Sequence, residues 1–419
     1  MQKLARKIAA ASVAAVATLL LLFVILPATV RNGDVAENKD AQPATINLSS
    51  YLTTRSGASL SWATVPGAYS FNIYRGNVII ANTPTEGPIA NKTQFTDYFD
   101  SGLQPSLTYS YKVAAVNSTG HEIAWSNQTS VETKKSSLAT PLRTMIFSPQ
   151  IGNKSDPTNN QTLTVLKKYF TEGDGVLSSS DHQMKVINDA IGKNVLSNHY
   201  LAPRIAPYDP AEDCDLGYVN DIDQFISAAR TNTADGYRYQ YIISDIEGWC
   251  WTPSSERENE AYISSFNAVA EKAHAAGFQA GIQPTHDELV KGINGSSPWY
   301  PKIHYENLDL FLIQFQKYYF TKTSGYKEID QIAMNQIQSM ITLAKQQNPN
   351  VSIFLQFNFD WGTNDKMLQV VDRFKGQING VSMIQLGPND PDVIAQRSPF
   401  QGYGTPSHID QFLAAIKSM

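Results

Sequence analysis

The chain has 419 residues, of which 42% are hydrophobic and 17% are charged, and its formal net charge at pH 7 is −5. This length exceeds one average domain and predicts two, and the composition is typical of a globular protein rather than a disordered one. The acidic balance, without a basic cluster beyond the first residues, gives no electrostatic footprint for nucleic acid, so we expect no such partner.

Residues 1–31 are typical of an export segment. Three cations, Lys3, Arg6 and Lys7, precede an uncharged apolar run over residues 8–30. The run is long enough to span a bilayer as a helix, and the cations before it predict that the rest of the chain faces outward. The segment is either a cleaved signal peptide or an uncleaved membrane anchor. Both alternatives predict an extracellular or cell-surface protein, and the second makes the membrane a partner. Residues 32–44 are polar and predict a linker.

Two other features agree with export. Asn-x-Ser/Thr sequons, which suggest a glycoprotein, occur at Asn47, Asn91, Asn117, Asn127, Asn153, Asn160, Asn294 and Asn350. The chain has only two cysteines, Cys214 and Cys250. Outside the cell they would form a disulfide that contributes roughly 3–4 kcal/mol through chain entropy. The alternative is two unrelated buried thiols.

Residues 45–134 contain short alternating runs separated by Gly, Pro and Asn. The clearest runs cover residues 58–62, 70–74, 107–116 and 129–133. Period-two alternation with closely spaced turn residues predicts the antiparallel strands of a small β-sandwich.

Part of this region resembles a known family. Residues 103–120, Leu-Gln-Pro-Ser-Leu-Thr-Tyr-Ser-Tyr-Lys-Val-Ala-Ala-Val-Asn-Ser-Thr-Gly, resemble the fibronectin type III motif in which a leucine and a proline precede a corner tyrosine. Residues 60–62 and 71–74 match the core tryptophan and the following strand of that family. The resemblance implies that Tyr109 is the corner, with its hydroxyl bonded back to the main chain. It implies a spacer or interaction module and says nothing about chemistry.

Residues 140–419 show a different pattern, in which apolar runs alternate with amphipathic stretches. Strands are predicted over residues 143–148, 196–202, 239–247, 278–284, 308–316, 351–358 and 380–386, and an eighth is expected between 175 and 194. Helices are predicted over residues 256–276, 328–347, 365–374 and 407–419. Apolar strands separated by helices predict parallel β/α units, here a (β/α)₈ TIM barrel. An open doubly wound sheet is the alternative, but the chain has no Gly-rich phosphate loop to support it.

Active sites of such barrels lie at the carboxyl ends of the strands. Amides recur at these ends, as Gln283, Gln314, Gln356, Asn358 and Gln385. A ring of amides can bind sugar hydroxyls, but the same amides could instead bond to one another as a polar plug inside the barrel. Beside the ends lie Trp249, Trp251 and Trp361, whose rings could stack on pyranose faces, although each alone is more often a loop-packing residue.

The strand over residues 239–247 ends in two carboxylates. Asp245 and Glu247 are two residues apart, so their side chains leave the strand on one face, roughly 6.5–7 Å apart at their origins. Such a pair lets one acid protonate a leaving oxygen while the other stabilises positive charge or orients a reacting group. Glu247 is the candidate general acid, Asp245 its partner, and Asp360 the candidate nucleophile or base. The alternative is an acid pair bonded to neighbouring amides or capping the next helix.

Residues 240–247, Gln-Tyr-Ile-Ile-Ser-Asp-Ile-Glu, partly resemble the fourth-strand motif of glycoside hydrolase family 18, Asp-x-x-Asp-x-Asp-x-Glu. They resemble the Asp-x-Glu of family 25 lysozymes more loosely. Gln240 and Ile243 stand where family 18 has aspartates. The resemblance implies that Glu247 is the acid and that Asp245 holds an N-acetyl group, which attacks its own anomeric carbon.

We therefore expect an exported or cell-surface glycoside hydrolase that acts on a polysaccharide or glycan by carboxylate acid catalysis. The histidines and cysteines lack metal-ligand spacing, so we expect neither a metal nor a cofactor. The alternative is a non-catalytic carbohydrate-binding or structural cell-surface protein, which the incomplete motif and the excess of amides over acids at the strand ends favour.

Overall fold

The structure is a computed structural model that describes residues 46–84, 96–148, 151, 158–201, 205, 221–246, 256, 261–284, 289–290, 298–315, 328–359, 363–385 and 405–419. The chain from residue 43 onward forms one compact unit. Within the described ranges, no helix is long and apolar enough to cross a membrane. The predicted export segment and both cysteines lie outside these ranges.

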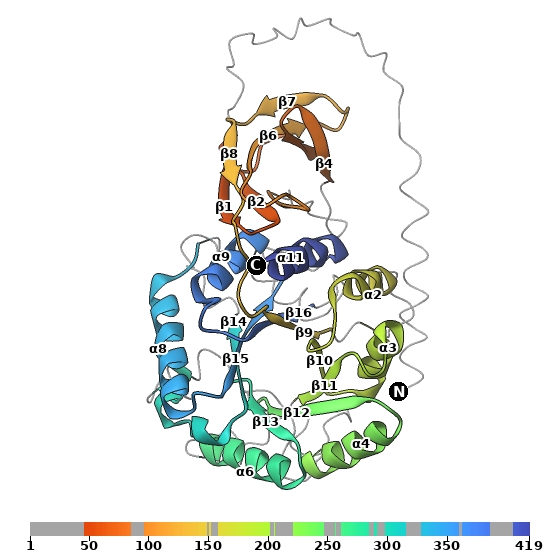
Figure 1. The fold of residues 1–419 in the computed structure, drawn as a ribbon, viewed down its shortest axis with the longest axis vertical. Coiled ribbons are helices and arrows are strands. Elements are labelled where there is room, and N and C mark those ends of the chain that lie inside the picture. Colours follow the sequence, from red (N-terminus) through yellow and green to blue (C-terminus); the bar gives the residue numbers. More distant parts are fainter. Residues whose placement is uncertain are drawn as a thin grey trace, which may run out of the picture. The chain divides into compact units, whose positions relative to one another are not determined.

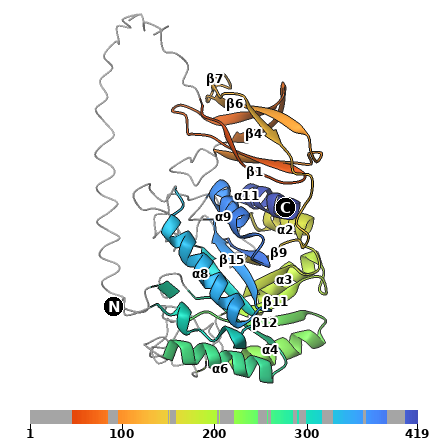
Figure 2. The same cartoon turned by 60° about the vertical axis from the view of Figure 1, so that its left-hand side comes forward.

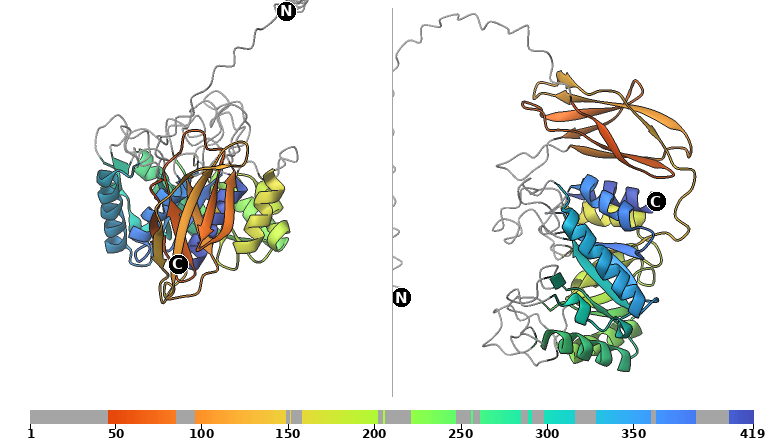
Figure 3. Two further views of the ribbon diagram at one scale, coloured as in Figure 1. Left: turned by 90° about the horizontal axis from the view of Figure 1, so that it is seen from above. Right: turned by 90° about the vertical axis from the view of Figure 1, so that its left-hand side faces the viewer.

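The N-terminal module is a sandwich of two antiparallel sheets, coloured red to yellow in Figure 1. One sheet has the order β1-β2-β5, with β1 (Ser49–Thr53), β2 (Gly57–Ser61) and β5 (Asp97–Ser101). The other has the order β4-β3-β6-β7, with β3 (Ser70–Arg75), β4 (Val78–Pro84), β6 (Thr108–Val116) and β7 (Glu122–Trp125), while β8 (Thr129–Glu132) pairs with β6. Figure 3 shows these strands from two further directions. The predicted β-sandwich is therefore confirmed.

The corner tyrosine and the core tryptophan lie where the fibronectin type III resemblance implies. The backbone N–H of Gln104 donates to the Tyr109 hydroxyl at 2.9 Å, which ties the crossover to the main chain. Trp62 is buried in the module core, and its ring centroid is 5.5 Å from that of Phe71. Alternation explains this core, because every second residue of a strand points to the same face of its sheet.

Eight parallel strands form a closed barrel in chain order, with the last strand pairing to the first. They are β9 (Arg143–Phe147), β10 (Gly175–Ser178), β11 (Ser197–Leu201), β12 (Arg238–Ser244), β13 (Gln279–Ile282), β14 (Leu310–Phe315), β15 (Ser352–Asn358) and β16 (Gly380–Ile384). The predicted (β/α)₈ barrel is therefore confirmed, and its eighth strand, β10, lies within the range in which it was expected.

Helices surround this ring of strands (Figure 1), and Figure 2 shows α8 and α9 on the outer side of the barrel. They are α2 (Thr158–Tyr169), α3 (Asp181–Ile191), α4 (Ile222–Ala234), α6 (Ala261–Ala275), α8 (Gln331–Gln347), α9 (Asn364–Phe374) and α11 (Pro406–Ser418). Two short 3₁₀ segments, η2 (Tyr300–Lys302) and η3 (Tyr305–Asn307), precede β14.

The barrel interior is filled by apolar side chains. They form one buried cluster of Met145, Leu177, Leu201, Tyr241, Ile243, Leu310, Leu312 and Phe354. Glycines make room for large side chains: a Cβ on Gly380 would lie 2.3 Å from Phe354 Cε1, and one on Gly175 would lie 2.4 Å from His199 Nε2. The interior is therefore a packed core and not a pore.

Candidate functional site

Asp245 continues the inward-facing series of β12. Tyr241 and Ile243 belong to the cluster inside the barrel, whereas Ile242 packs in the layer between strands and helices. Asp245 follows the strand directly, two residues beyond Ile243, and therefore points to the interior side at the carboxyl end of the barrel. The residue is half-buried.

Two glutamine side chains hold the Asp245 carboxylate. Gln283 Nε2 donates to Asp245 Oδ2 and Gln314 Nε2 donates to Asp245 Oδ1, each at 3.4 Å. Gln314 Nε2 also donates to the backbone carbonyl of Gln283 at 3.2 Å. Both glutamines are buried, at 3% and 2% exposed. Each carboxylate oxygen therefore faces an amide donor from a different strand end, at a distance that is long for a hydrogen bond.

The hydrogen bonds continue to Gln356 and Ser382. Gln314, Gln356 and Ser382 are direct neighbours in register across β14, β15 and β16. Gln356 Nε2 donates to Gln283 Oε1 at 3.0 Å and to Ser382 Oγ at 3.3 Å. Gln356 Oε1 is buried and accepts no hydrogen bond within the described part of the chain. We call this set, Asp245, Gln283, Gln314, Gln356 and Ser382, the mouth network.

The mouth network has features of both interpretations of the amides. The mutual bonds among the buried glutamines are those of a polar plug. Asp245 is the member of the network that is not fully buried, so a ligand hydroxyl could contact it, whereas the unused acceptor Gln356 Oε1 is enclosed.

The other two predicted amides differ from each other. Asn358 is buried and lies two residues beyond Gln356, on the same face of β15. Gln385 takes no part in the mouth network: Ser148 Oγ donates to its Oε1 and its Nε2 donates to Thr162 Oγ1, both at 3.1 Å. Gln385 therefore ties the end of β9 to α2, and a role in substrate binding stays a prediction.

The remaining predicted residues lie outside the described part of the chain. They are Glu247, Asp360, Trp249, Trp251, Trp361, Cys214 and Cys250. Their roles, including the disulfide, stay predictions. Ser382 was not predicted, although its inward position two residues after Gly380 is a signal that strand alternation could have used.

His199 lies inside the barrel and takes part in its packing. Its Nδ1 accepts from the backbone N–H of Tyr241 at 3.3 Å. Burial, and then the positive charge of Arg143, lower the pKa of His199 to about 3. The ring is therefore neutral at physiological pH. Among the residues that the structure describes, no group of three or more His, Cys, Asp or Glu side chains could hold a metal ion.

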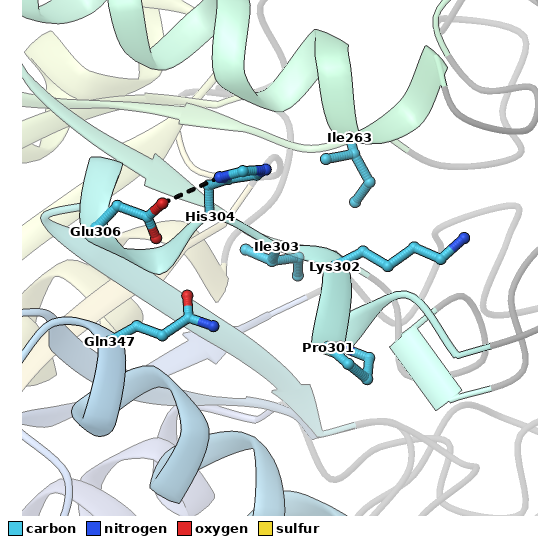
Figure 4. A pocket seen from close by; sticks show the side chains of 7 residues that line it. All are labelled: Ile263, Pro301, Lys302, Ile303, His304, Glu306 and Gln347. Carbon is cyan, nitrogen blue, oxygen red and sulfur yellow. Dashed lines mark hydrogen bonds and ion pairs between the residues drawn. The ribbon is translucent and has the colours of Figure 1, made fainter.

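A separate depression of about 730 Å³ lies on the outside of the barrel (Figure 4). It is lined by Ile263, Pro301, Lys302, Ile303, His304, Glu306 and Gln347. His304 Nδ1 lies 3.0 Å from Glu306 Oε1. The depression is bounded by the start of α6, the two 3₁₀ segments and the end of α8, and it shares no residue with the mouth network.

The sequence comparisons with known proteins match a short part of the chain. No family model matches it. A poly(3-hydroxybutyrate) depolymerase of Delftia acidovorans is 38% identical over 86 residues, which are 20% of this chain and 16% of that protein. The chain thus spans less than a fifth of that relative.

Solved structures with some likeness include two β-glucuronidases. The Ruminococcus gnavus enzyme covers 81% of this chain and 61% of its own, at 10% identity and a TM-score of 0.36. The Parabacteroides merdae enzyme covers 82% and 47%, at 8% identity and a TM-score of 0.35. A human fibronectin type III domain covers 24% and 94%, at 17% identity and a TM-score of 0.18. Scores this low carry no argument about function, and the fold rests on the strand orders given above.

Proposed function

We propose that the barrel is a glycoside hydrolase of the cell surface or extracellular space, acting on a polysaccharide or glycan. The observation that supports it is the placement of Asp245: a half-buried carboxylate at the carboxyl end of the barrel, with both oxygens held by amide donors. Barrel enzymes carry their chemistry at this end, and an oriented carboxylate is a component of glycosidic bond cleavage.

In the proposed reaction Glu247 gives its proton to the leaving glycosidic oxygen as the bond to the anomeric carbon breaks. Asp245 either stabilises the positive charge that develops on the sugar ring or orients a substrate N-acetyl group toward the anomeric carbon. Water then adds to that carbon, and the proton that it loses returns to Glu247. Gln283 and Gln314 keep Asp245 in one orientation throughout, so no rearrangement of the acid is needed as charge develops.

A second candidate function is glycan binding without turnover. The excess of amides over acids at the strand ends favours it, whereas the mutual bonding of the buried Gln283, Gln356 and Ser382 favours a purely structural role. A structural cell-surface role is the third candidate.

The test is release of reducing ends from a panel of polysaccharides and glycans by the chain from residue 43. Glu247→Gln should lower kcat by about 100-fold or more, the usual contribution of a general acid. Asp245→Asn keeps the shape of the side chain and should also lower kcat. Glu306→Gln, the same acid-to-amide change in the outer depression, is the matched control and should leave activity unchanged. Equal activity of Glu247→Gln and the parent chain would reject the catalytic role, and glycan binding without turnover would support the second candidate.

A further inference from the structure

Exposed apolar side chains in the described residues concentrate on the N-terminal module. Those in the module are Tyr69, Val78, Ile79, Leu107, Ile123 and Trp125, whereas the barrel helices contribute Ile332. An exposed tryptophan is the most informative of them, because a large apolar ring that stays partly in solvent is available to contact a ligand or a partner.

Trp125 lies on the outer face of the sheet β4-β3-β6-β7. In β3, Phe71 and Ile73 point into the module core, so Asn72 and Tyr74 point outward. Asn72 is in register with Asn82 of β4 and with Ala114 of β6, and Ala114 is in register with Trp125 of β7. These residues therefore form one row across four strands.

The two aromatic rings of this face lie against each other. The ring centroids of Tyr74 and Trp125 are 5.2 Å apart and their planes are inclined by 36°. Ala114 lies between Asn72 and Trp125 in the row and is completely buried, so larger neighbours on this face cover it. Trp125 remains 42% exposed, which leaves part of its ring available for contact.

A chain of hydrogen bonds fixes polar groups beside the rings. The Tyr74 hydroxyl and Asn72 Nδ2 donate to Glu122 Oε1 at 2.6 and 2.7 Å. Asn82 Nδ2 donates to Asn72 Oδ1 at 2.8 Å and to Ser70 Oγ at 3.1 Å. Because these side chains are already held in place, a ligand that binds them would lose less free energy to side-chain ordering.

We propose that this aromatic face, made of Asn72, Tyr74, Asn82, Glu122 and Trp125, binds a neutral polysaccharide. A pyranose would stack on the exposed part of the Trp125 ring, and its hydroxyls would bond to the Asn and Glu groups beside it. The proposal goes beyond hydrolysis by the barrel and does not depend on it.

The charge and strand pairing of the face favour this ligand over a peptide. Lys112 is in register with Tyr74 and offsets the charge of Glu122, so the face is close to neutral and matches an uncharged ligand. Strands β4 and β7 are the outer strands of this sheet, so an added peptide strand would pair along one of their edges and would not cover the row that crosses all four strands. The contact with the barrel comes from the other sheet, where the Phe99 backbone N–H donates to Gln411 Oε1 of α11 at 3.2 Å.

The test measures binding by the full chain carrying Glu247→Gln, so that turnover cannot consume the ligand. Affinity electrophoresis and pull-down would use cellulose, chitin, xylan and starch, with the acidic polysaccharide pectin as the charge control. We expect Trp125→Ala to weaken binding by at least about tenfold, as truncation of an aromatic anchor does. Asn82→Ala, which keeps both rings, should weaken it by a smaller factor. Ile332→Ala, which truncates an exposed apolar side chain elsewhere, should bind like the parent.

Three results would overturn the proposal: no binding to any neutral polysaccharide, equal binding by Trp125→Ala and the parent, or a preference for pectin. Thermal unfolding of each variant shows whether it is folded. Activity on a small chromogenic glycoside, measured with Glu247 intact, separates the two proposals. Trp125→Ala should leave that activity unchanged, so loss of polysaccharide binding with intact turnover concerns the aromatic face alone.

Discussion

The mouth network and the aromatic face build the same kind of hydrogen-bonded ladder in opposite environments. In the barrel, Gln356 donates to Gln283 and Ser382, and these side chains are almost completely buried. In the module, Asn82 donates to Asn72, which donates to Glu122, and water can reach the ladder. Amides on adjacent strands thus help to specify the fold where water is excluded, and where water has access they form the exposed polar groups that we propose as part of a binding surface.

The largest loss of stability is expected when one amide of the buried mouth network is removed. Gln356→Ala removes a fully buried side chain and leaves Gln283 Oε1 without its donor, so the free energy of unfolding should fall by about 3–5 kcal/mol. Gln356→Met keeps most of the volume and should cost less. Urea unfolding of both variants measures the difference. A loss below about 1 kcal/mol in Gln356→Ala would contradict a tightly packed network.

Glycine substitutions test how completely the barrel interior is filled. A Cβ on Gly380 would lie 2.3 Å from Phe354 Cε1 and 2.4 Å from the carbonyl oxygen of Arg143, so Gly380→Ala should destabilise the chain by about 2–3 kcal/mol. Gly376 is the matched control, because a Cβ there meets no atom within 4 Å. Thermal unfolding should show a lowered Tm for Gly380→Ala and an unchanged Tm for Gly376→Ala. Equal Tm values for the two variants would mean that the side chains around Gly380 can shift to make room for a methyl group.

Acid should lower the free energy of unfolding, because His199 is neutral inside the folded barrel. The pKa of His199 is about 3 in the folded chain and about 6.5 in an unfolded one. As pH falls below 6.5 the unfolded state takes up a proton that the folded state does not, so stability is lost progressively down to about pH 3. At pH 5 this residue alone should cost about 2 kcal/mol.

The check is the free energy of unfolding at pH 7 and pH 5. His199→Gln should lose less stability between these values than the parent. His408 has its pKa lowered to about 3 by burial and contributes in the same direction, so part of the acid sensitivity should remain. An identical pH dependence in His199→Gln would show that this ring is not the neutral interior group.

The smallest effect is expected on the aromatic face. Asn72→Ala removes one bond to Glu122 and one from Asn82, but water can replace both, so the free energy of unfolding should change by only about 0.5 kcal/mol. Urea unfolding measures it beside Gln356→Ala. A loss as large as that of Gln356→Ala would make the exposed ladder a structural element rather than a binding surface.

The sequence predicted the barrel well because buried parallel strands are long apolar runs. Strand β10 was the hardest to find, since Gly175–Ser178 is only four residues long and offers little pattern. Helices α2, α3 and α4 were not predicted, because all three are rich in polar residues. The start of α4 is set by a local contact, in which the Asp221 side chain accepts from the backbone N–H of Gln224 at 2.9 Å.

The site could be predicted only as far as its location. A closed parallel barrel brings all strand ends together, so Asp245 and the glutamines were expected to converge. The sequence does not state which amide bonds to which, because that depends on strand register and side-chain rotamers. Gln385 shows the limit: Ser382 and Gln385 lie an odd number of residues apart, and one step along a strand reverses the face. Gln385 therefore reaches α2 instead of the interior.

The packed barrel interior also limits the direction from which Asp245 can be approached. Because Leu312, Phe354 and their neighbours fill the axis, no molecule can reach the acid through the barrel from its amino end. On the proposed function, a polymer substrate would therefore approach from the carboxyl end, and its cleaved fragments would leave on that same side.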